Sequence, residues 1–349
     1  MTTPAHLKHD RLVMPNIPRT GGYSLKSSSR YKLAGRTMRV CSIFVLWFWL
    51  AGCTKHEQLD AVEVTDHMHS LWARDAEQVW AVGEEGLILH SKDSGANWRL
   101  QKSGTAARLL SVFGSDSQLW AVGAEGTILT STDGGEHWQP QQSVTDRGLY
   151  SVYVIGAKAW AAGDRGVILY SPDGGKNWQA QKSGTKSQLT SIYATGSQVW
   201  AVGDDGVILY SADGGTHWKA QKSGLSVSLR AVYANGPQVW AVGDSGTILH
   251  SEDDGDHWQS ETSGTEQTLC ALSGSGAQLW SVGTDGTILY SADGGKNWQP
   301  QVSPTAHHLL SVFGVGSELW SVGYGGAIMH SVDGGHTWQR QISENLPSG

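Results

Sequence analysis

The chain has 349 residues, of which 45 are Gly, 17 are Trp and only 3 are Cys, and its formal net charge is −7. Charged residues make up 16% of the chain, too few for a solvated disordered protein, and three cysteines cannot build a disulfide framework. The glycines follow no Gly-X-Y period, which excludes collagen. The excess of Trp and Gly therefore requires a repeated structural reason.

The N-terminal region has the features of a bacterial lipoprotein signal. Residues 1–39 carry eight Lys or Arg and one Asp. The apolar run 40–50 that comes next is too short to span a bilayer comfortably and has the dimensions of a signal-peptide core. It leads into Leu50-Ala51-Gly52-Cys53, which resembles the lipobox, where a peptidase cuts before a lipid-modified Cys. We expect 1–52 to be removed, with Met38 as an alternative start. A buried strand with a chance Cys is the weaker alternative.

Cleavage at this point predicts how the mature chain is placed. Cys53 carries the lipid, and 53–66 form a lipidated residue with its tether. Several acyl chains on one Cys give stable anchoring. By resemblance to enterobacterial sorting rules, Thr54 favours the outer membrane, so we expect the periplasmic face of the outer membrane or the cell surface. Loss of the basic leader, of charge +7, leaves −14 on the remainder.

Two tryptophan positions recur every 40 residues without a slip. The first set is Trp80, Trp120, Trp160, Trp200, Trp240, Trp280 and Trp320. The second set is Trp98, Trp138, Trp178, Trp218, Trp258, Trp298 and Trp338. A fixed period of this length is the signature of a repeat architecture.

The unit 186–225 shows what one repeat contains. Short alternating runs rich in β-formers are separated by turn residues. The four expected strands, A to D, are 189–193, 198–202, 207–211 and 217–221. Between strands B and C, Gly203-Asp204-Asp205-Gly206 fits a type I turn followed by a left-handed Gly that closes a G1 bulge.

Seven units of four short antiparallel strands predict an all-β, seven-bladed β-propeller. A helical solenoid is excluded because no segment sustains a 3.6-residue period. We expect the ring to cover 67–345, with 346–349 as a tail. Met68–Trp72 would supply strand A of blade 1. Blade 7 would close the ring on blade 1, with 59–64 as an additional edge strand.

The C–D connection reads Ser-x-Asp-x-Gly-x-x-Trp in every unit, which resembles the Asp-box of sialidases and other propellers. The seven Asp residues are Asp93, Asp133, Asp173, Asp213, Asp253, Asp293 and Asp333. The carboxylate can accept backbone N–H groups of its own turn, the Gly permits positive φ, and the Trp covers the hairpin. We therefore interpret the box as structural, neither catalytic nor metal-binding.

Two further repeated positions are assigned to packing. Trp80 and Ile88, with their equivalents, should fill the space between blades. Position 90 and its equivalents alternate mainly between His and Tyr, which suggests packing with a polar tip. A zinc site from His90 and His330, brought near each other by ring closure, is the disfavoured alternative.

Candidate binding residues are those that the repeat does not dictate. Hairpin connectivity places the B–C turns and the D–A connections on the face opposite the Asp-boxes. The position after the first strand-A residue varies most, and a cluster there would line the axial opening. The candidate binding face consists of Arg108, Arg147, Arg230, His307, His308, Glu84, Asp204 and Asp205. Solvated polar turns remain the alternative interpretation.

No catalytic constellation departs from the repeat. Every unit has 40 residues, so no loop is enlarged to carry chemistry, and phosphate loops and zinc spacings are absent from the sequence. We expect no enzyme activity, no cofactor and no metal. The charge of −14 disfavours nucleic acid.

Residues 200–218, from Trp200-Ala-Val-Gly203 to Trp218, resemble the unit of the photosystem II stability and assembly factor family. That resemblance implies a seven-bladed Asp-box propeller that chaperones assembly by binding protein through a basic surface. This chain departs from the family in being acidic. We expect a monomeric, lipid-anchored envelope scaffold or assembly factor that binds a protein partner. A glycan-binding or sialidase-like propeller is the alternative.

Overall fold

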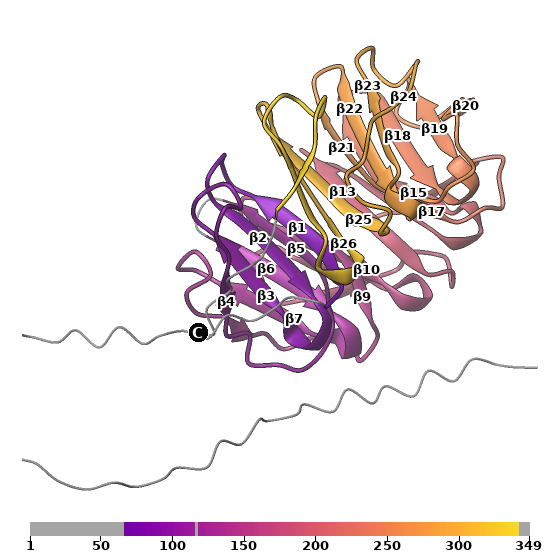
Figure 1. Ribbon diagram of the computed structural model, residues 1–349. Helices are drawn as coiled ribbons and strands as arrows, with labels where there is room; N and C mark the ends of the chain where they lie inside the picture. Colours follow the sequence, from indigo (N-terminus) through magenta and orange to yellow (C-terminus); the bar gives the residue numbers. More distant parts are fainter. Residues whose placement is uncertain (1–65, 116–117, 342–349) are drawn as a thin grey trace, which may run out of the picture. The chain divides into compact units, whose positions relative to one another are not determined.

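The computed structural model describes residues 66–115 and 118–341, which form the predicted all-β, seven-bladed propeller (Figure 1). Each blade is a four-stranded antiparallel sheet built from four consecutive strands. By its contacts the chain divides into two units, Met1–Lys55 and His56–Gly349, and all described residues belong to the second. The predicted leader, Cys53, 59–64 and 346–349 lie outside the described residues.

The inner two strands of each blade are the longest. The innermost strands are β1 (Met68–Ala73), β5 (Leu109–Ser115), β9 (Leu149–Ile155), β13 (Leu189–Thr195), β17 (Leu229–Asn235), β21 (Leu269–Ser275) and β25 (Leu309–Val315). The second strands are β2 (Val79–Gly83), β6 (Gln118–Gly123), β10 (Lys158–Gly163), β14 (Gln198–Gly203), β18 (Gln238–Gly243), β22 (Gln278–Gly283) and β26 (Glu318–Gly323).

The outer two strands are shorter. The third strands are β3 (Ile88–Ser91), β7 (Ile128–Ser131), β11 (Ile168–Ser171), β15 (Ile208–Ser211), β19 (Ile248–Ser251), β23 (Ile288–Ser291) and β27 (Ile328–Ser331). The outermost strands are β4 (Arg99–Gln101), β8 (Gln139–Pro140), β12 (Gln179–Gln181), β16 (Lys219–Gln221), β20 (Gln259–Glu261), β24 (Gln299–Pro300) and β28 (Gln339–Arg340). The expected strand D is too long at its start, because Trp218 belongs to the Asp-box turn and pairing begins at Lys219.

Helical structure in the described ranges is confined to three-residue turns between the second and third strands, and none of these is long enough to cross a membrane. The seven turns are η1 (Glu84–Gly86), η2 (Ala124–Gly126), η3 (Asp164–Gly166), η4 (Asp204–Gly206), η5 (Asp244–Gly246), η6 (Thr284–Gly286) and η7 (Tyr324–Gly326).

The type of these turns differs from the prediction. In η4 both central residues have positive φ, 59° at Asp205 and 67° at Gly206, and Val207 N–H donates to the Asp204 carbonyl at 3.2 Å. Two left-handed central residues define a type I′ turn, so the expected type I turn is wrong, whereas the expected left-handed conformation of Gly206 is confirmed. The type I′ turn prevails because its twist matches that of the two strands it joins.

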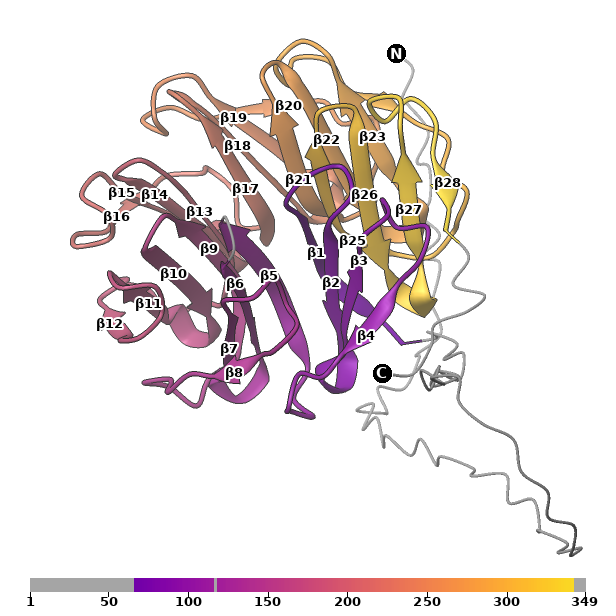
Figure 2. The ribbon, with the colours of Figure 1, turned by 90° about the vertical axis from the view of Figure 1, so that its left-hand side faces the viewer.

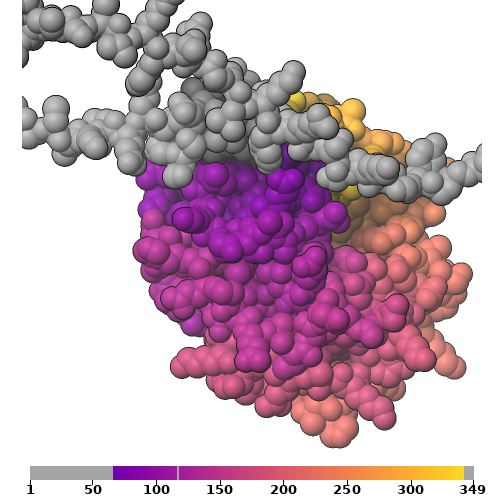
Figure 3. Space-filling model, turned by 90° about the horizontal axis from the view of Figure 1, so that it is seen from below, coloured from indigo at the N-terminus to yellow at the C-terminus, as the bar shows by residue number. Residues whose placement is uncertain are grey.

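The ring closes between blade 7 and blade 1, as predicted. β1 lies beside both β25 and β5, and Figure 2 shows β1 to β3 next to β25 and β26. Across this seam Leu71 N–H donates to Ser311 Oγ at 3.2 Å, and Trp320 Nε1–H donates to the Ser94 carbonyl at 2.9 Å. Gly326 N–H donates to the carbonyl of Asp66 at 3.2 Å. Consecutive blades succeed one another around the surface in Figure 3 as a progression of colour from indigo to orange.

The strand-B tryptophans form the core between blades. All seven are among the largest fully buried side chains. Trp80 packs with Val112 and Leu119 of the next blade and with Trp138 of that blade's Asp-box. Trp160 Nε1–H donates to the carbonyl of Gly214 in the following blade at 3.0 Å. The predicted inter-blade role of this position is confirmed.

The Asp-box is a hydrogen-bonded staple, as its sequence predicts. In blade 2 the Ser131 hydroxyl donates to Asp133 Oδ1 at 2.8 Å and accepts Gly135 N–H at 2.8 Å. The N–H of His137 donates to the same carboxylate oxygen at 3.0 Å. Hydrogen bonds from the His137 backbone, from its ring and from Ser131 lower the pKa of Asp133 to about 2. The carboxylate is thus engaged within its own turn.

Position 90 packs with a polar tip, as predicted. His90 stacks on Trp80 with ring centroids 4.3 Å apart, and its Nε2 lies 2.9 Å from Gln78 Oε1. His330 makes the same stack on Trp320 and bonds Glu318 of its own blade. Burial lowers the pKa of His90 to about 4. Each ring is therefore occupied within its own blade, which argues against the zinc alternative.

Candidate functional site

We call the face formed by the B–C turns and the D–A connections the axial face. These two kinds of loop contact each other: Asp204 N–H, in η4, donates to the Gln188 carbonyl at 3.0 Å, and Asp164 N–H, in η3, donates to the Gly148 carbonyl at 2.9 Å. The Asp-boxes lie at the opposite ends of the third strands. The axial face therefore carries the candidate residues, as hairpin connectivity predicts.

A cavity of about 350 Å³ occupies the centre of the ring. It is lined by the innermost strands of all seven blades. The variable position after the first strand-A residue contributes His69, Leu110, Tyr150, Thr190, Arg230, Cys270 and Leu310. The structure thus brings these residues together around the axial opening, as expected. Burial raises the pKa of the Cys270 thiol to about 11, so this cysteine is protonated at neutral pH.

A circle of aromatic side chains lies at the end of this cavity nearer the Asp-boxes. Strand A begins at the axial face, so the residues further along it lie deeper in the ring. Phe113, Tyr153 and Tyr193 succeed one another with centroids 4.3 and 4.5 Å apart. Tyr233, Phe313 and Trp72 continue the circle, and blade 6 interrupts it with Ser273. Sequence reasoning missed this feature, although the aromatic residues repeat at one strand position.

Arg230 is held by two carboxylates. Its Nε and Nη2 donate to Asp244 Oδ1 and Oδ2, both at 2.9 Å, and its Nη1 lies 3.9 Å from Asp204 Oδ1 in the neighbouring blade. The hydrogen bonds to Asp244 raise the pKa of the guanidinium further. Two of the predicted binding residues, Arg230 and Asp204, are therefore brought together as an inter-blade ion pair.

Glu84 forms a second paired cluster. Its Oε1 lies 3.0 Å from His69 Nε2, and its Oε2 accepts Arg108 Nε–H at 2.9 Å. Burial alone would raise the pKa of Glu84, but the hydrogen bonds from His69 and Arg108 outweigh it and lower the pKa. Burial lowers the pKa of His69, so this ring donates to Glu84 as the neutral form.

The other predicted residues lie in separate places on the axial face. Asp205 accepts the Ser187 hydroxyl at 3.0 Å. His307 packs over Gly325, and His308 Nδ1 accepts the backbone N–H of Asp285 at 3.0 Å. These three residues do not form one site with Arg230 or with Glu84.

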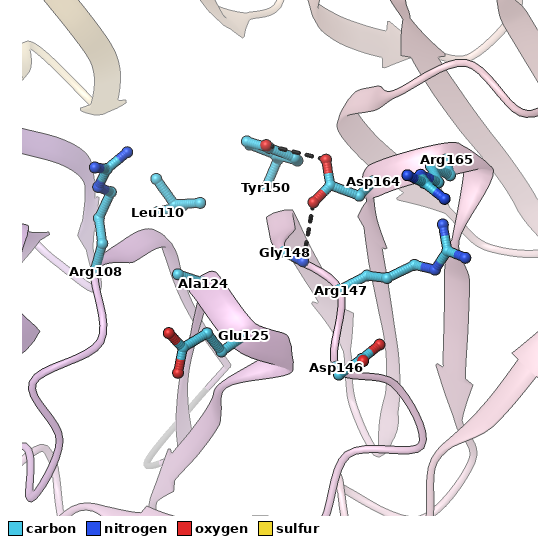
Figure 4. A pocket seen from close by; sticks show the side chains of 10 residues that line it. All are labelled: Arg108, Leu110, Ala124, Glu125, Asp146, Arg147, Gly148, Tyr150, Asp164 and Arg165. Atoms are coloured by element: carbon cyan, nitrogen blue, oxygen red, sulfur yellow. Dashed lines mark hydrogen bonds between the residues drawn. The ribbon is translucent and has the colours of Figure 1, made fainter. Parts of the chain in front are cut away.

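A second pocket on the axial face lies between blades 2 and 3 and has a volume of about 660 Å³. Its lining is Arg108, Leu110, Ala124, Glu125, Asp146, Arg147, Gly148, Tyr150, Asp164 and Arg165 (Figure 4). The hydroxyl of Tyr150 and the N–H of Gly148 each donate to the Asp164 carboxylate at 3.1 Å. Burial, and then the charge of Asp164, raise the pKa of Tyr150.

Two guanidinium groups of this pocket stand apart from the paired arginines. Arg147 and Arg165 both line the pocket on its blade 3 side (Figure 4), and neither has an ion-pair partner within 66–115 and 118–341. Arg165 occupies a left-handed position, with φ 51°, and is exposed. Sequence reasoning included Arg147 but missed Arg165, although an Arg where most blades have Asp, Glu or Ser was a visible signal.

The pocket is lined mainly by charged and hydrogen-bonding side chains. Asp164, its most enclosed carboxylate, is already engaged by Tyr150 and Gly148. Within the part of the chain that the structure describes, no three His, Cys, Asp or Glu side chains gather as metal ligands. A planar guanidinium pair of this kind suits a carboxylate or another oxyanion, because each group can donate two parallel hydrogen bonds.

Two family models match parts of the chain. Residues 107–187 match the model of the photosynthesis system II assembly factor YCF48, and residues 226–349 match a β-propeller domain model, DUF6242. No curated protein matches the chain significantly in sequence. The first of these matches covers the blades that form the pocket.

Solved structures give the same picture at the level of the fold. YCF48 from Cyanidioschyzon merolae aligns with a TM-score of 0.66 at 18% identity, covering 78% of this chain and 98% of that one. YCF48 bound to D1 peptide aligns at 0.65 and 21%, covering 80% and 96%. A GH74 enzyme from Niastella koreensis aligns at 0.66 and 12%, covering 80% of this chain but 55% of the enzyme.

The predicted resemblance is confirmed by the YCF48 family model and the shared architecture. The chain is a seven-bladed Asp-box β-propeller that resembles the photosystem II assembly factor YCF48 family.

Proposed function

We propose that this protein is a non-enzymatic, lipid-anchored envelope propeller that binds a protein partner through its axial face. The observation that carries the proposal is the pocket between blades 2 and 3, where Arg147 and Arg165 have no ion-pair partner in the described part of the chain. Unpaired guanidinium groups beside a 660 Å³ cavity, one half-buried at Arg147 and one exposed at Arg165, favour a ligand that supplies the missing anions. The partner segment is therefore an acidic stretch or a chain terminus.

The comparison with YCF48 supports a peptide as the ligand. A YCF48 propeller of similar fold has been solved with a D1 peptide bound. The axial face here can receive an extended segment, because the pocket and the central cavity share Leu110 and Tyr150 in their linings. A segment anchored at Arg147 would thus run toward the axis of the ring.

The state of the carboxylates supports a role without catalysis. Glycosidases use a pair of carboxyl groups, one as acid and one as base or nucleophile. On the axial face Asp244 is held by Arg230, Glu84 by Arg108 and His69, and Asp164 by Tyr150. Arginine-paired carboxylates stay ionised and are poor proton donors. The GH74 similarity covers only about half of that enzyme and concerns the fold alone.

A photo-crosslinking experiment in intact cells tests the binding proposal. Val144, 55% exposed and three residues before Arg147, is the position for a photoreactive amino acid. We expect a discrete crosslinked protein, and the crosslink should disappear when Arg147 and Arg165 are both changed to Ala. A crosslink to polysaccharide would support the glycan-binding alternative. Persistence of the protein crosslink in the double variant would refute the pocket as the anchor.

Two independent assays test the rest of the proposal. Labelled palmitate should be incorporated by the wild type and not by Cys53→Ser, and incorporation by the variant would refute lipidation at this residue. The purified protein should not hydrolyse sialosides or other glycosides. Turnover that is lost on Arg230→Ala would refute the non-enzymatic role. Neither result depends on the identity of the partner.

A further inference from the structure

A histidine hydrogen bond occurs twice, in adjacent blades, on the axial face. His308 and His67 both stand one residue before an innermost strand, β25 and β1 respectively. Asp285 N–H donates to His308 Nδ1 at 3.0 Å, and Gly325 N–H donates to His67 Nδ1 at 3.1 Å. The other blades have Arg108, Gly148, Gln188, Ser228 and Thr268 at this position.

Both bonds reach the same part of the preceding blade. Asp285 and Gly325 are the central residues of η6 and η7, so each histidine holds the B–C turn of the blade before it. The residues at this position in the other five blades have no imidazole nitrogen that could accept the N–H of the turn. The repetition shows that the geometry is a built feature of blades 6, 7 and 1.

Tyr324 joins the two histidines into one array. Its ring stacks on His67 with centroids 4.2 Å apart and lies 5.3 Å from the ring of His308. Tyr324 is the first residue of η7, where the described turns of the other blades have Glu, Asp, Ala or Thr. The array therefore spans the seam at which the ring closes.

Backbone hydrogen bonds at this seam involve His67 and the residue before it. Gly326 N–H donates to the Asp66 carbonyl, and Glu84 N–H donates to the His67 carbonyl, both at 3.2 Å. His67 thus links blade 7 to blade 1 through its ring on one side and its carbonyl on the other. Loosening its ring bond would act directly on ring closure.

The two bonds require neutral imidazole rings. An imidazole nitrogen accepts a hydrogen bond only while it carries no proton, so Nδ1 must be bare and the proton must sit on Nε2. Histidine is the side chain that ordinarily gains its proton between about pH 5 and 8. Protonation would place a hydrogen on Nδ1 facing a backbone N–H, and the bond could not persist.

The charged neighbours determine the consequences of protonation. The Asp285 carboxylate lies 3.6 Å from His308 Nδ1, so a protonated His308 has an alternative partner in place of the Asp285 N–H. His69 is close enough to His67 for their charges to oppose each other, and Glu84 is already occupied by His69 and Arg108. His307 packs over Gly325 and bonds the Thr305 hydroxyl only through its backbone N–H.

We propose that His67, Tyr324 and His308 form a proton-operated latch on the ring-closing seam. Neutral rings hold η6 and η7 against the chain segments that enter blades 7 and 1. Protonation releases both turns and loosens this sector of the axial face. The latch is independent of the proposed partner site between blades 2 and 3.

Amide hydrogen exchange of the full chain tests the latch between pH 7.5 and 5.0. Rates are corrected for the intrinsic pH dependence of exchange and expressed as protection factors. We expect protection of the Asp285 and Gly325 amides to fall about threefold to tenfold on acidification, the range for loss of one hydrogen bond. The Asp204 amide, which in η4 donates to the Gln188 carbonyl with no histidine involved, should keep its protection.

Asparagine variants separate the latch from a purely structural role. Asn Oδ1 occupies the place of His Nδ1 and accepts an N–H at any pH, so His67→Asn with His308→Asn should retain protection at pH 5.0. His307→Asn is the matched control, because its ring makes neither bond, and it should respond like the wild type. Protection of both wild-type amides that is independent of pH would overturn the proposal. So would an undiminished acid response in the double variant. If the double variant does not fold, the wild-type titration decides alone.

Discussion

The Asp-box rim, meaning the seven C–D turns, and the axial face contrast within the same blades. At the rim one geometry is repeated: in all seven boxes the Ser hydroxyl donates to the Asp carboxylate at 2.8 to 2.9 Å. On the axial face the blades vary, with Arg165, Asp205 and Gly325 at one equivalent turn position. The repeated residues maintain the fold, and the departures from the repeat are where specific interactions become available.

On the axial face, some of the arginines that depart from the repeat are ion-paired and others are not. Arg230 is neutralised by Asp244 and Asp204, and Arg108 by Glu84. Arg147 and Arg165 line the pocket with no such partner in 66–115 and 118–341. A paired charge contributes to stability, whereas an unpaired one is free to recognise a ligand. Substitutions at the rim, in the core and on the axial face test that division.

The largest effect should come from the core beneath the rim. Trp160→Ala removes a fully buried indole and its hydrogen bond to Gly214 across a blade interface. We expect the free energy of unfolding to fall by about 3–5 kcal/mol. Urea denaturation monitored by circular dichroism measures this. A loss below about 1 kcal/mol would contradict an inter-blade core role for this position.

Arg230→Ala should have an intermediate effect. The change leaves Asp244 and Asp204 without their shared cation, so we expect a loss of about 1–3 kcal/mol in the free energy of unfolding. Arg165→Ala is the matched control on the same face and should change stability by less than about 0.5 kcal/mol. Equal losses in the two variants would remove the distinction between paired and unpaired arginines.

Asp133→Asn should change the acid dependence of stability. The pKa of Asp133 is lowered to about 2 in the fold, so its carboxylate stabilises the fold above its ordinary pKa near 4. That contribution is lost as the pH falls toward 2. The variant should lose less than about 1 kcal/mol at pH 7, because an amide oxygen can accept the same bonds but a carboxylate accepts them more strongly. Its free energy of unfolding should also decline less between pH 4 and 2 than that of the wild type. An unchanged acid slope would contradict the staple.

The smallest effect concerns a belt of serines around the central cavity. Ser191 Oγ accepts Val232 N–H at 3.4 Å, and Ser70, Ser111, Ser151 and Ser311 make the same inter-blade bond. Blade 5 has Ala231 at this position. Ala231→Ser should restore the bond and raise the free energy of unfolding by about 0.5–1 kcal/mol. A destabilised variant would show that the blade 5 interface is too close for a hydroxyl.

The repeated part of the molecule was predictable from sequence for a physical reason. The blades, the inter-blade Trp and the Asp-box each depend on contacts within one unit or between identical neighbours, so one period contains the information. The type I′ turn was missed because Gly203-Asp204-Asp205-Gly206 permits both turn types. The twist of the paired strands, which the sequence does not display, selects between them.

The axial face was only partly predictable. Candidates such as Arg147, Arg230 and Glu84 were found because they depart from the repeat. The pairing of Arg230 with Asp204 depends on how closely adjacent blades approach, which the sequence does not display. Arg147 and Arg165 instead meet within blade 3, where Asp164 N–H bonds the Gly148 carbonyl. The tautomers of His67 and His308 likewise depend on N–H groups contributed by other blades.

Affinity capture with the purified full-length protein tests most directly whether the axial face binds the partner while the Asp-box rim maintains the fold. The wild type, Arg147→Ala with Arg165→Ala, Asp133→Asn and the outer-strand control Arg340→Ala are compared at equal folded concentration. We predict that the double variant retains its stability but does not capture the partner identified by crosslinking. The rim variant Asp133→Asn and the control Arg340→Ala should still capture that partner. Partner capture that survives the double variant and is lost in Asp133→Asn would contradict the assignment of binding to the axial face.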